Sequence, residues 1–150
     1  MLILTVCTGN TCRSPMVEGI LKELIRENDL DIEIKSAGIF ATNGMRASDN
    51  SVIALEEIGI DISEHRSTLV DEELINKADL ILTMTNSHKQ RLINKFPNAK
   101  NKIFLLHEYS EGKSNDIIDP FGGSLGEYKI VRDEIYRVVE AIIKKLTMDN

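Results

Sequence analysis

One short stretch of the chain contains Cys7, an arginine six positions later (Arg13) and a serine directly after it (Ser14). The apolar run 1–6 before them favours a buried strand, and the amphipathic pattern from Met16 onward favours a helix. A loop between a strand and a helix N-terminus turns its backbone N–H groups inward and binds anions. A thiol at the start of such a loop is expected to be a thiolate, and therefore a nucleophile.

The chemistry that these residue types support is phosphoryl transfer. The backbone N–H groups from Thr8 to Arg13 can bind phosphate oxygens, and the planar Arg13 guanidinium can bind two of them at once. The Ser14 hydroxyl is expected to reach the Cys7 sulfur and to stabilise it as a thiolate and as a leaving group. The stretch therefore predicts a phosphatase that forms a phosphocysteine intermediate.

Two further residues shape this loop. Gly9 permits a tight turn and the close approach of an anion. The Asn10 side chain is expected to hold the loop through hydrogen bonds to the backbone. Because Gly9 is the only glycine in the stretch, a dinucleotide-binding fingerprint is not supported.

The rest of the chain alternates strands with helices. Strands are expected at 1–6, 31–36, 79–84 and 102–106, helices at 16–27, 48–58, 70–78, 87–96 and 125–146, and a long polar loop from His107 to Ser124. This alternation predicts an α/β fold with a parallel sheet and helices on both faces. Ligands bind beyond the carboxyl ends of such strands, where the Cys7 loop lies.

Length, charge and cysteine content limit the alternatives. The 150 residues suit one domain, 1–150. A formal net charge of −6 without a basic stripe argues against a nucleic-acid partner. We expect no signal peptide and no membrane span, and two cysteines on one loop form no secreted disulfide framework. A cytoplasmic monomer is the resulting expectation.

The stretch Cys7 to Pro15 resembles the phosphate-binding loop of the low-molecular-weight protein tyrosine phosphatase family. Asp119-Pro120 matches the general-acid motif of that family, and Ser36-Ala37-Gly38 also fits its pattern. The resemblance covers essentially the whole chain. It implies a four-stranded parallel sheet in the order 2-1-3-4 with the phosphatase loop after strand 1. It also implies that no metal and no cofactor are required.

The resemblance assigns a role to each catalytic residue. The Cys7 thiolate attacks phosphorus in line, while Arg13 and the loop amides stabilise the equatorial oxygens. Asp119 protonates the leaving group and then activates the water that hydrolyses phosphocysteine.

Other positions match residues that support the loop in this family. Ser36 and His65 match residues that form hydrogen bonds to the equivalent of Asn10. Cys12 matches a second cysteine that can form a disulfide with Cys7 and protect it from irreversible oxidation. The alternative for Cys12 is a small buried filler.

The substrate depends on Thr11 and on the motif 119–123. Tyrosine-directed members usually carry an apolar residue at the position of Thr11 and a pair of aromatic residues after the general acid, whereas here Phe121 stands alone. Both features resemble a bacterial subgroup that hydrolyses phosphoarginine in proteins. Thr11 is expected to bond the guanidinium or to orient water, and Phe121 to stack on it. Phosphoarginine is the favoured substrate and phosphotyrosine the alternative.

The residues expected to contact substrate are thus Thr8, Gly9, Asn10, Thr11, Cys12, Ser14 and Phe121, and the expected partners are phosphorylated proteins. An arsenate reductase needs further downstream cysteines, which this chain lacks. A non-catalytic phosphate-binding module has no need for Asp119, and a phosphocysteine carrier needs neither the arginine nor the acid. His88 and His107 have no motif around them, so no role is predicted for them.

Overall fold

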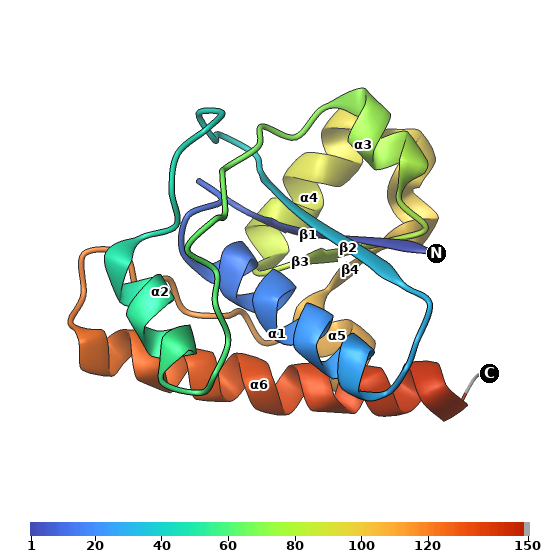
Figure 1. The fold of residues 1–150 in the computed structure, drawn as a ribbon. Coiled ribbons are helices and arrows are strands. Elements are labelled where there is room, and N and C mark those ends of the chain that lie inside the picture. Colours follow the sequence, from blue (N-terminus) through green and yellow to red (C-terminus); the bar gives the residue numbers. More distant parts are fainter. Residues whose placement is uncertain (149–150) are drawn as a thin grey trace.

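At the centre of the protein is one parallel sheet of four strands in the order β2-β1-β3-β4 (Figure 1). The computed structural model describes residues 1–148. The strands are β1 (Leu2–Cys7), β2 (Glu33–Gly38), β3 (Leu80–Thr83) and β4 (Ile103–Leu105). The predicted fold class and strand order are both confirmed.

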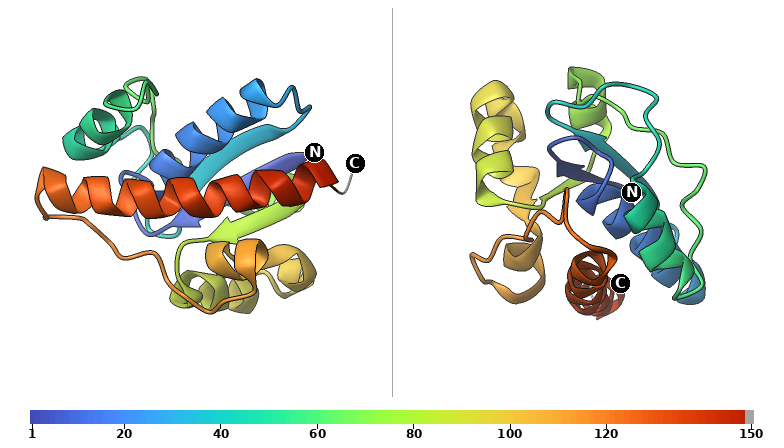
Figure 2. Two further views of the ribbon diagram at one scale, coloured as in Figure 1. Left: turned by 90° about the horizontal axis from the view of Figure 1, so that it is seen from below. Right: turned by 90° about the vertical axis from the view of Figure 1, so that its left-hand side faces the viewer.

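Helices cover both faces of the sheet (Figures 1 and 2). Within residues 1–148 they are α1 (Arg13–Glu27), α2 (Asp49–Glu56), α3 (Glu72–Lys77), α4 (Asn86–Lys95), α5 (Leu106–Glu111), α6 (Leu125–Met148) and the 3₁₀ helix η1 (Pro97–Lys102). Helices α1 and α6 pack on one face, with α2 beside them, and α3 and α4 pack on the other. No helix in this part of the chain is long and apolar enough to cross a membrane.

Strand β1 is buried along its whole length because both faces of the sheet are covered. Its side chains alternate between two apolar clusters. Ile3 and Cys7 belong to the cluster under α1 and α6, whereas Leu4 and Val6 belong to the cluster under α3 and α4. This two-sided burial explains why apolar residues follow one another without a break in the sequence.

Helix α6 buries the stripe that the sequence predicts. Its residues Val131, Ile135, Val138, Ile142 and Leu146 are all buried in the first cluster. They recur at helical spacing, so one face of a long helix covers the sheet beside α1.

Two predicted elements need correction. The first helix begins at Arg13 rather than near Met16, so the last residues of the anion-binding loop already form its first turn. The predicted loop from His107 to Ser124 is wrong in its first part, where α5 follows β4 directly. The Glu108 carboxylate accepts a hydrogen bond from the backbone N–H of Leu105 (3.2 Å), which stabilises the start of α5. A helix of this length is too short to give a periodic pattern.

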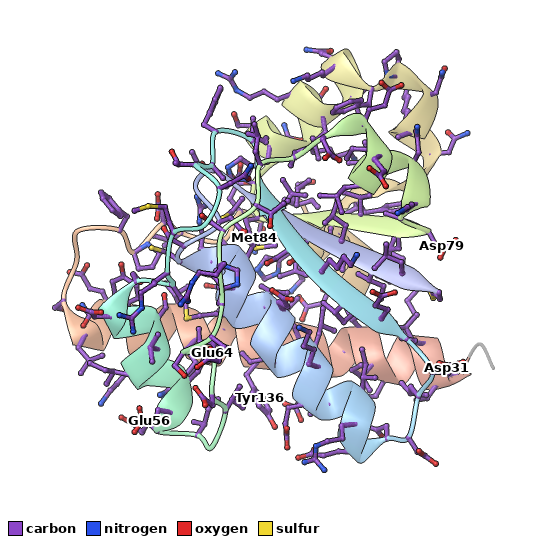
Figure 3. All side chains as sticks on the ribbon, turned by 45° about the horizontal axis from the view of Figure 1, so that its top comes forward. Asp31, Glu56, Glu64, Asp79, Met84 and Tyr136 are labelled. Atoms are coloured by element: carbon purple, nitrogen blue, oxygen red, sulfur yellow. The ribbon has the colours of Figure 1, made fainter. Side chains whose placement is uncertain are left out.

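The carboxyl ends of the strands lie at one edge of the sheet. Figure 3 labels Asp79 and Met84, which directly precede and follow β3. The backbone N–H of Met84 donates to Val6 O (3.1 Å), and Met84 O accepts from the N–H of Ile117 (2.8 Å). The loops after β1 and β3 and the segment before α6 therefore meet at this edge.

Candidate active site

The Cys7 sulfur lies at the end of β1 and is buried. The Ser14 hydroxyl oxygen is 2.9 Å from it, as the sequence predicts, and the backbone N–H of Asn10 donates to it at 3.2 Å. Helix α1 begins at Arg13, so its positive end lies at the same loop. Both contacts suit a thiolate, because a thiolate only accepts hydrogen bonds.

Asn10 fixes the shape of the loop. Its φ of 58° places it in the left-handed region, which Asn tolerates better than most residues. Its side-chain amide donates to Ser14 Oγ (2.8 Å) and Ser36 Oγ (2.9 Å), and its Oδ1 accepts from the N–H of Thr68 (2.9 Å). These bonds reach side chains on α1 and β2 as well as one backbone group, so the loop is tied to three separate segments.

A second layer of contacts centres on Glu18, which sequence reasoning missed. His65 Nε2 donates to the carbonyl oxygen of Asn10 (2.8 Å), and its Nδ1 lies 3.6 Å from the Glu18 carboxylate. Ser36 Oγ donates to the same carboxylate (2.6 Å). Burial raises the pKa of Glu18, but hydrogen bonds from His65, Lys22 and Ser36 outweigh it and lower this pKa to about 2.

The guanidinium of Arg13 is buried, with a side-chain exposure of 5%. Its Nη1 donates to the carbonyl oxygen of Ile117 (2.9 Å), and its Nη2 lies 3.6 Å from Asp119 Oδ2. Asp119 is half-exposed, and its Oδ1 accepts from the N–H of Phe121 (3.1 Å). The cation of the loop and the carboxylic acid of the distant motif are thus neighbours. A guanidinium has five N–H donors, so Arg13 retains donors for an anion.

The segment that carries Asp119 is also anchored where β3 passes into α4. The carboxylate of Asp116 accepts a hydrogen bond from the N–H of Asn86 (2.8 Å), at the first residue of α4. Together with the bond from Ile117 to Met84, this contact docks the segment on the edge formed by β3 and α4.

Two exposed aromatic side chains lie on segments that are linked to the loop, Phe40 through its backbone N–H to Thr8 O and Phe121 through Asp119. Phe121 is 76% exposed and Phe40 is 64% exposed, and the Arg91 guanidinium lies 5.1 Å from the Phe40 ring centre. Thr11 is partly buried, and its carbonyl oxygen accepts from the N–H of Ser48 (2.8 Å). Exposed aromatic rings are thus available on the segments next to the polar loop. Sequence reasoning identified Phe121 and missed Phe40.

The second cysteine lies in a polar niche under the loop. Cys12 Sγ is 3.4 Å from the Tyr128 hydroxyl and 3.6 Å from Ser48 Oγ. Burial raises the pKa of Tyr128 to about 12, and its hydrogen bond with Cys12 contributes to the rise. Cys7 and Cys12 are both free thiols in this structure. The niche is polar, which a simple apolar filler does not require.

The two histidines without a motif lie in different places. His107 is buried between α5 and α6, where its Nε2 lies 2.8 Å from Glu134 Oε1. His88 is buried at the start of α4, and its Nε2 lies 2.8 Å from Thr8 Oγ1. One of the two, His88, thus contacts the anion-binding loop.

No group of three or more potential metal ligands is present in the part of the chain that the structure describes.

The sequence model of the family described as low molecular weight phosphotyrosine protein phosphatase matches residues 2–150. The chain belongs to this family. The predicted class, a cysteine-dependent protein phosphatase, is thereby confirmed.

Relatives within the family carry two kinds of name. A protein-arginine-phosphatase of Bacillus subtilis (strain 168) is 42% identical over 149 residues, which is 99% of each chain. A low molecular weight protein-tyrosine-phosphatase, PtpB, of Staphylococcus aureus is 37% identical over 93% of this chain and 94% of its own.

Solved structures of the family superimpose closely. A cysteine-to-serine variant of the YwlE arginine phosphatase with a phosphorylated active-site serine is 41% identical and has a TM-score of 0.97. The alignment covers 100% of this chain and 98% of that one. The YwlE arginine phosphatase of Geobacillus stearothermophilus is also 41% identical, with a TM-score of 0.93 over 99% of this chain and 94% of that one.

Proposed function

We propose that the protein hydrolyses phosphoarginine in proteins through a phosphocysteine intermediate on Cys7. The observation that carries this proposal is the placement of Arg13 and Asp119, 3.6 Å apart, beside the loop that holds the Cys7 sulfur. A nucleophile, a cation for phosphate and an acid for the leaving group are the three parts that the reaction requires.

In the first step the Cys7 thiolate attacks phosphorus, so that an S–P bond forms and the P–N bond of phosphoarginine breaks. Arg13 and the loop N–H groups stabilise the charge on the equatorial oxygens. Asp119 gives its proton to the departing guanidino nitrogen. Because Asp119 is half-exposed while Cys7 is buried, the acid faces the side from which a protein side chain must leave.

In the second step the Asp119 carboxylate takes a proton from water, and the water oxygen attacks phosphorus. The S–P bond breaks, and inorganic phosphate and the Cys7 thiolate are formed. The hydrogen bonds from Ser14 and from the Asn10 N–H stabilise that thiolate as the leaving group. Asn10 is in turn held by Ser36 and by His65, which support the loop without touching the reacting atoms.

Phosphoarginine is favoured over phosphotyrosine by residues and by relatives. Thr11 offers a hydroxyl within the loop, and the exposed face of Phe121 suits a flat guanidinium. The relatives named arginine phosphatases are 42% identical to this chain, compared with 37% for PtpB. Phosphotyrosine remains the second candidate, because PtpB covers nearly the same length and a phenol ring can also pack on an exposed aromatic side chain such as Phe40 or Phe121.

We also propose that the protein acts as a single domain and as a monomer in the cytoplasm, on phosphorylated proteins and without nucleic acid. The continuous sheet supports the single domain, and the net charge of −6 argues against a nucleic-acid partner.

The test is release of inorganic phosphate from a peptide that carries phosphoarginine, together with the intact mass of the protein after rapid denaturation. The wild-type protein releases phosphate, and Asp119→Asn accumulates one phosphoryl group that a peptide map places on Cys7. Cys7→Ala releases no phosphate and gains no phosphoryl group. Turnover by Cys7→Ala, or a phosphoryl group on another residue, would overturn the mechanism.

A further inference from the structure

His88 is buried beside the active-site loop although nothing in the proposed mechanism uses it. It lies in the first turn of α4, where its backbone N–H donates to the hydroxyl of Thr85 (3.2 Å). Only 6% of its surface is exposed, and its Nε2 lies 2.8 Å from the hydroxyl of Thr8, the residue that follows Cys7. The contact joins the loop after β1 to the helix after β3.

The surroundings of the His88 ring decide which nitrogen carries the proton. Nδ1 is buried and has no hydrogen-bond partner within residues 1–148. A buried N–H without an acceptor is rarer and more costly than an unpaired lone pair. The proton is therefore on Nε2, which donates to the oxygen of Thr8.

His88 also stays neutral at physiological pH. Burial lowers its pKa to about 4, and the positive charges of Arg13 and Arg91 act in the same direction. The carboxylates of Asp116 and Asp119 oppose this shift and do not cancel it. A neutral ring keeps one fixed donor and adds no charge next to the anion-binding loop.

The Thr8 hydroxyl is held in one orientation as a result. A hydroxyl has two lone pairs and one proton, and the His88 N–H occupies one lone pair. The backbone of Thr8 is also fixed, because its carbonyl oxygen accepts from the N–H of Phe40 (2.9 Å). Thr8 is exposed, so its second lone pair remains available at the mouth of the loop.

We propose that His88 is a positioning residue that orients the Thr8 hydroxyl to accept a hydrogen bond from the guanidinium of phosphoarginine. A guanidinium carries only donors, whereas the ring of an aryl phosphate has none to offer. The His88–Thr8 contact therefore favours the guanidino substrate and leaves aryl phosphates almost unaffected. This inference rests on the proposed function and adds a selectivity contact to it.

The experiment compares kcat/KM for a phosphoarginine peptide and for p-nitrophenyl phosphate in several variants. His88→Leu removes the donor, and we expect a loss of about tenfold on phosphoarginine and under about threefold on the aryl phosphate. Thr8→Val removes the acceptor of the same contact, and we expect a loss of about tenfold on phosphoarginine. His88→Gln places an N–H at similar reach and recovers most of the lost activity. The double variant is no worse than either single one, because both remove the same contact.

His107→Leu is the matched control, since it removes another buried histidine that does not touch the loop. We expect this variant to keep the wild-type substrate ratio even where its Tm falls. Equal losses of His88→Leu on both substrates, or losses that multiply in the double variant, overturn the inference while the proposed function stands. A wild-type protein without activity on phosphoarginine overturns both.

Discussion

The Arg13 guanidinium and the Asp119 carboxylate lie 3.6 Å apart, although they come from opposite ends of the chain. Arg13 is buried and held by the carbonyl oxygen of Ile117, whereas Asp119 is half-exposed. The pair thus joins a fixed cation inside the loop to a carboxyl group that a leaving group can reach. A phosphate dianion in the loop takes up the donors of Arg13 and leaves the Asp119 carboxyl group free for proton transfer.

The role of Asp119 as an acid predicts that its effect depends on the leaving group. Because kcat/KM reports the formation of phosphocysteine, Asp119→Asn is expected to lower kcat/KM by about 100-fold on a phosphorylated peptide, whose leaving group requires a proton. The loss on dinitrophenyl phosphate is expected to be under about tenfold, because that leaving group departs without protonation. Steady-state rates over a series of aryl phosphates measure this dependence. An equal loss of kcat/KM on every substrate would show that Asp119 does not protonate the leaving group.

The low pKa of Glu18 predicts that this residue contributes to stability in a pH-dependent way. Its pKa is about 2 in the folded protein and 4.5 as the ordinary value, so the unfolded chain takes up a proton first as pH falls. The carboxylate therefore stabilises the fold by on the order of 3 kcal/mol above pH 4.5, and this contribution is lost between pH 4.5 and 2. Urea unfolding of the wild-type protein and of Glu18→Gln checks the prediction.

The gap in unfolding free energy between these two proteins is expected to be widest near pH 6 and to shrink below pH 4.5. Glu27→Gln, an exposed change on the same helix, serves as the control and shows little gap at any pH. A difference in unfolding free energy between the wild-type protein and Glu18→Gln that stays constant from pH 6 to 3 contradicts this prediction.

Thr11 predicts the direction of a substrate switch. Thr11→Ile removes the hydroxyl and adds an apolar surface at the loop, so we expect phosphotyrosine to gain and phosphoarginine to lose. The ratio of the two kcat/KM values is expected to change by at least about tenfold, and Thr11→Ser keeps the wild-type ratio. An unchanged ratio in Thr11→Ile would remove position 11 from substrate selection.

The sheet and the loop were predictable because their signals are local. The unbroken apolar run of β1 follows from burial on both faces, and the stripe of α6 follows from helical spacing. Helix α5 was not predictable in the same way, because its six residues span fewer than two turns.

The missed contacts have a different cause. Glu18 lies with charged residues on the polar side of α1, and only its partners His65 and Ser36 show that it belongs to the loop. His88 and Thr8 are far apart in the chain, but they follow neighbouring parallel strands. Residues just beyond adjacent parallel strands meet at one edge of the sheet, and this rule could have predicted the contact between Thr8 and His88.

The central claim is that this protein is an arginine phosphatase, and matched peptides test it most directly. Two peptides of one sequence, with phosphoarginine or phosphotyrosine at the same position, are compared by kcat/KM at the same pH and ionic strength. The account predicts that phosphoarginine is hydrolysed at least about tenfold more efficiently, and that Cys7→Ala abolishes both activities. Equal values, or a preference for phosphotyrosine, would contradict it.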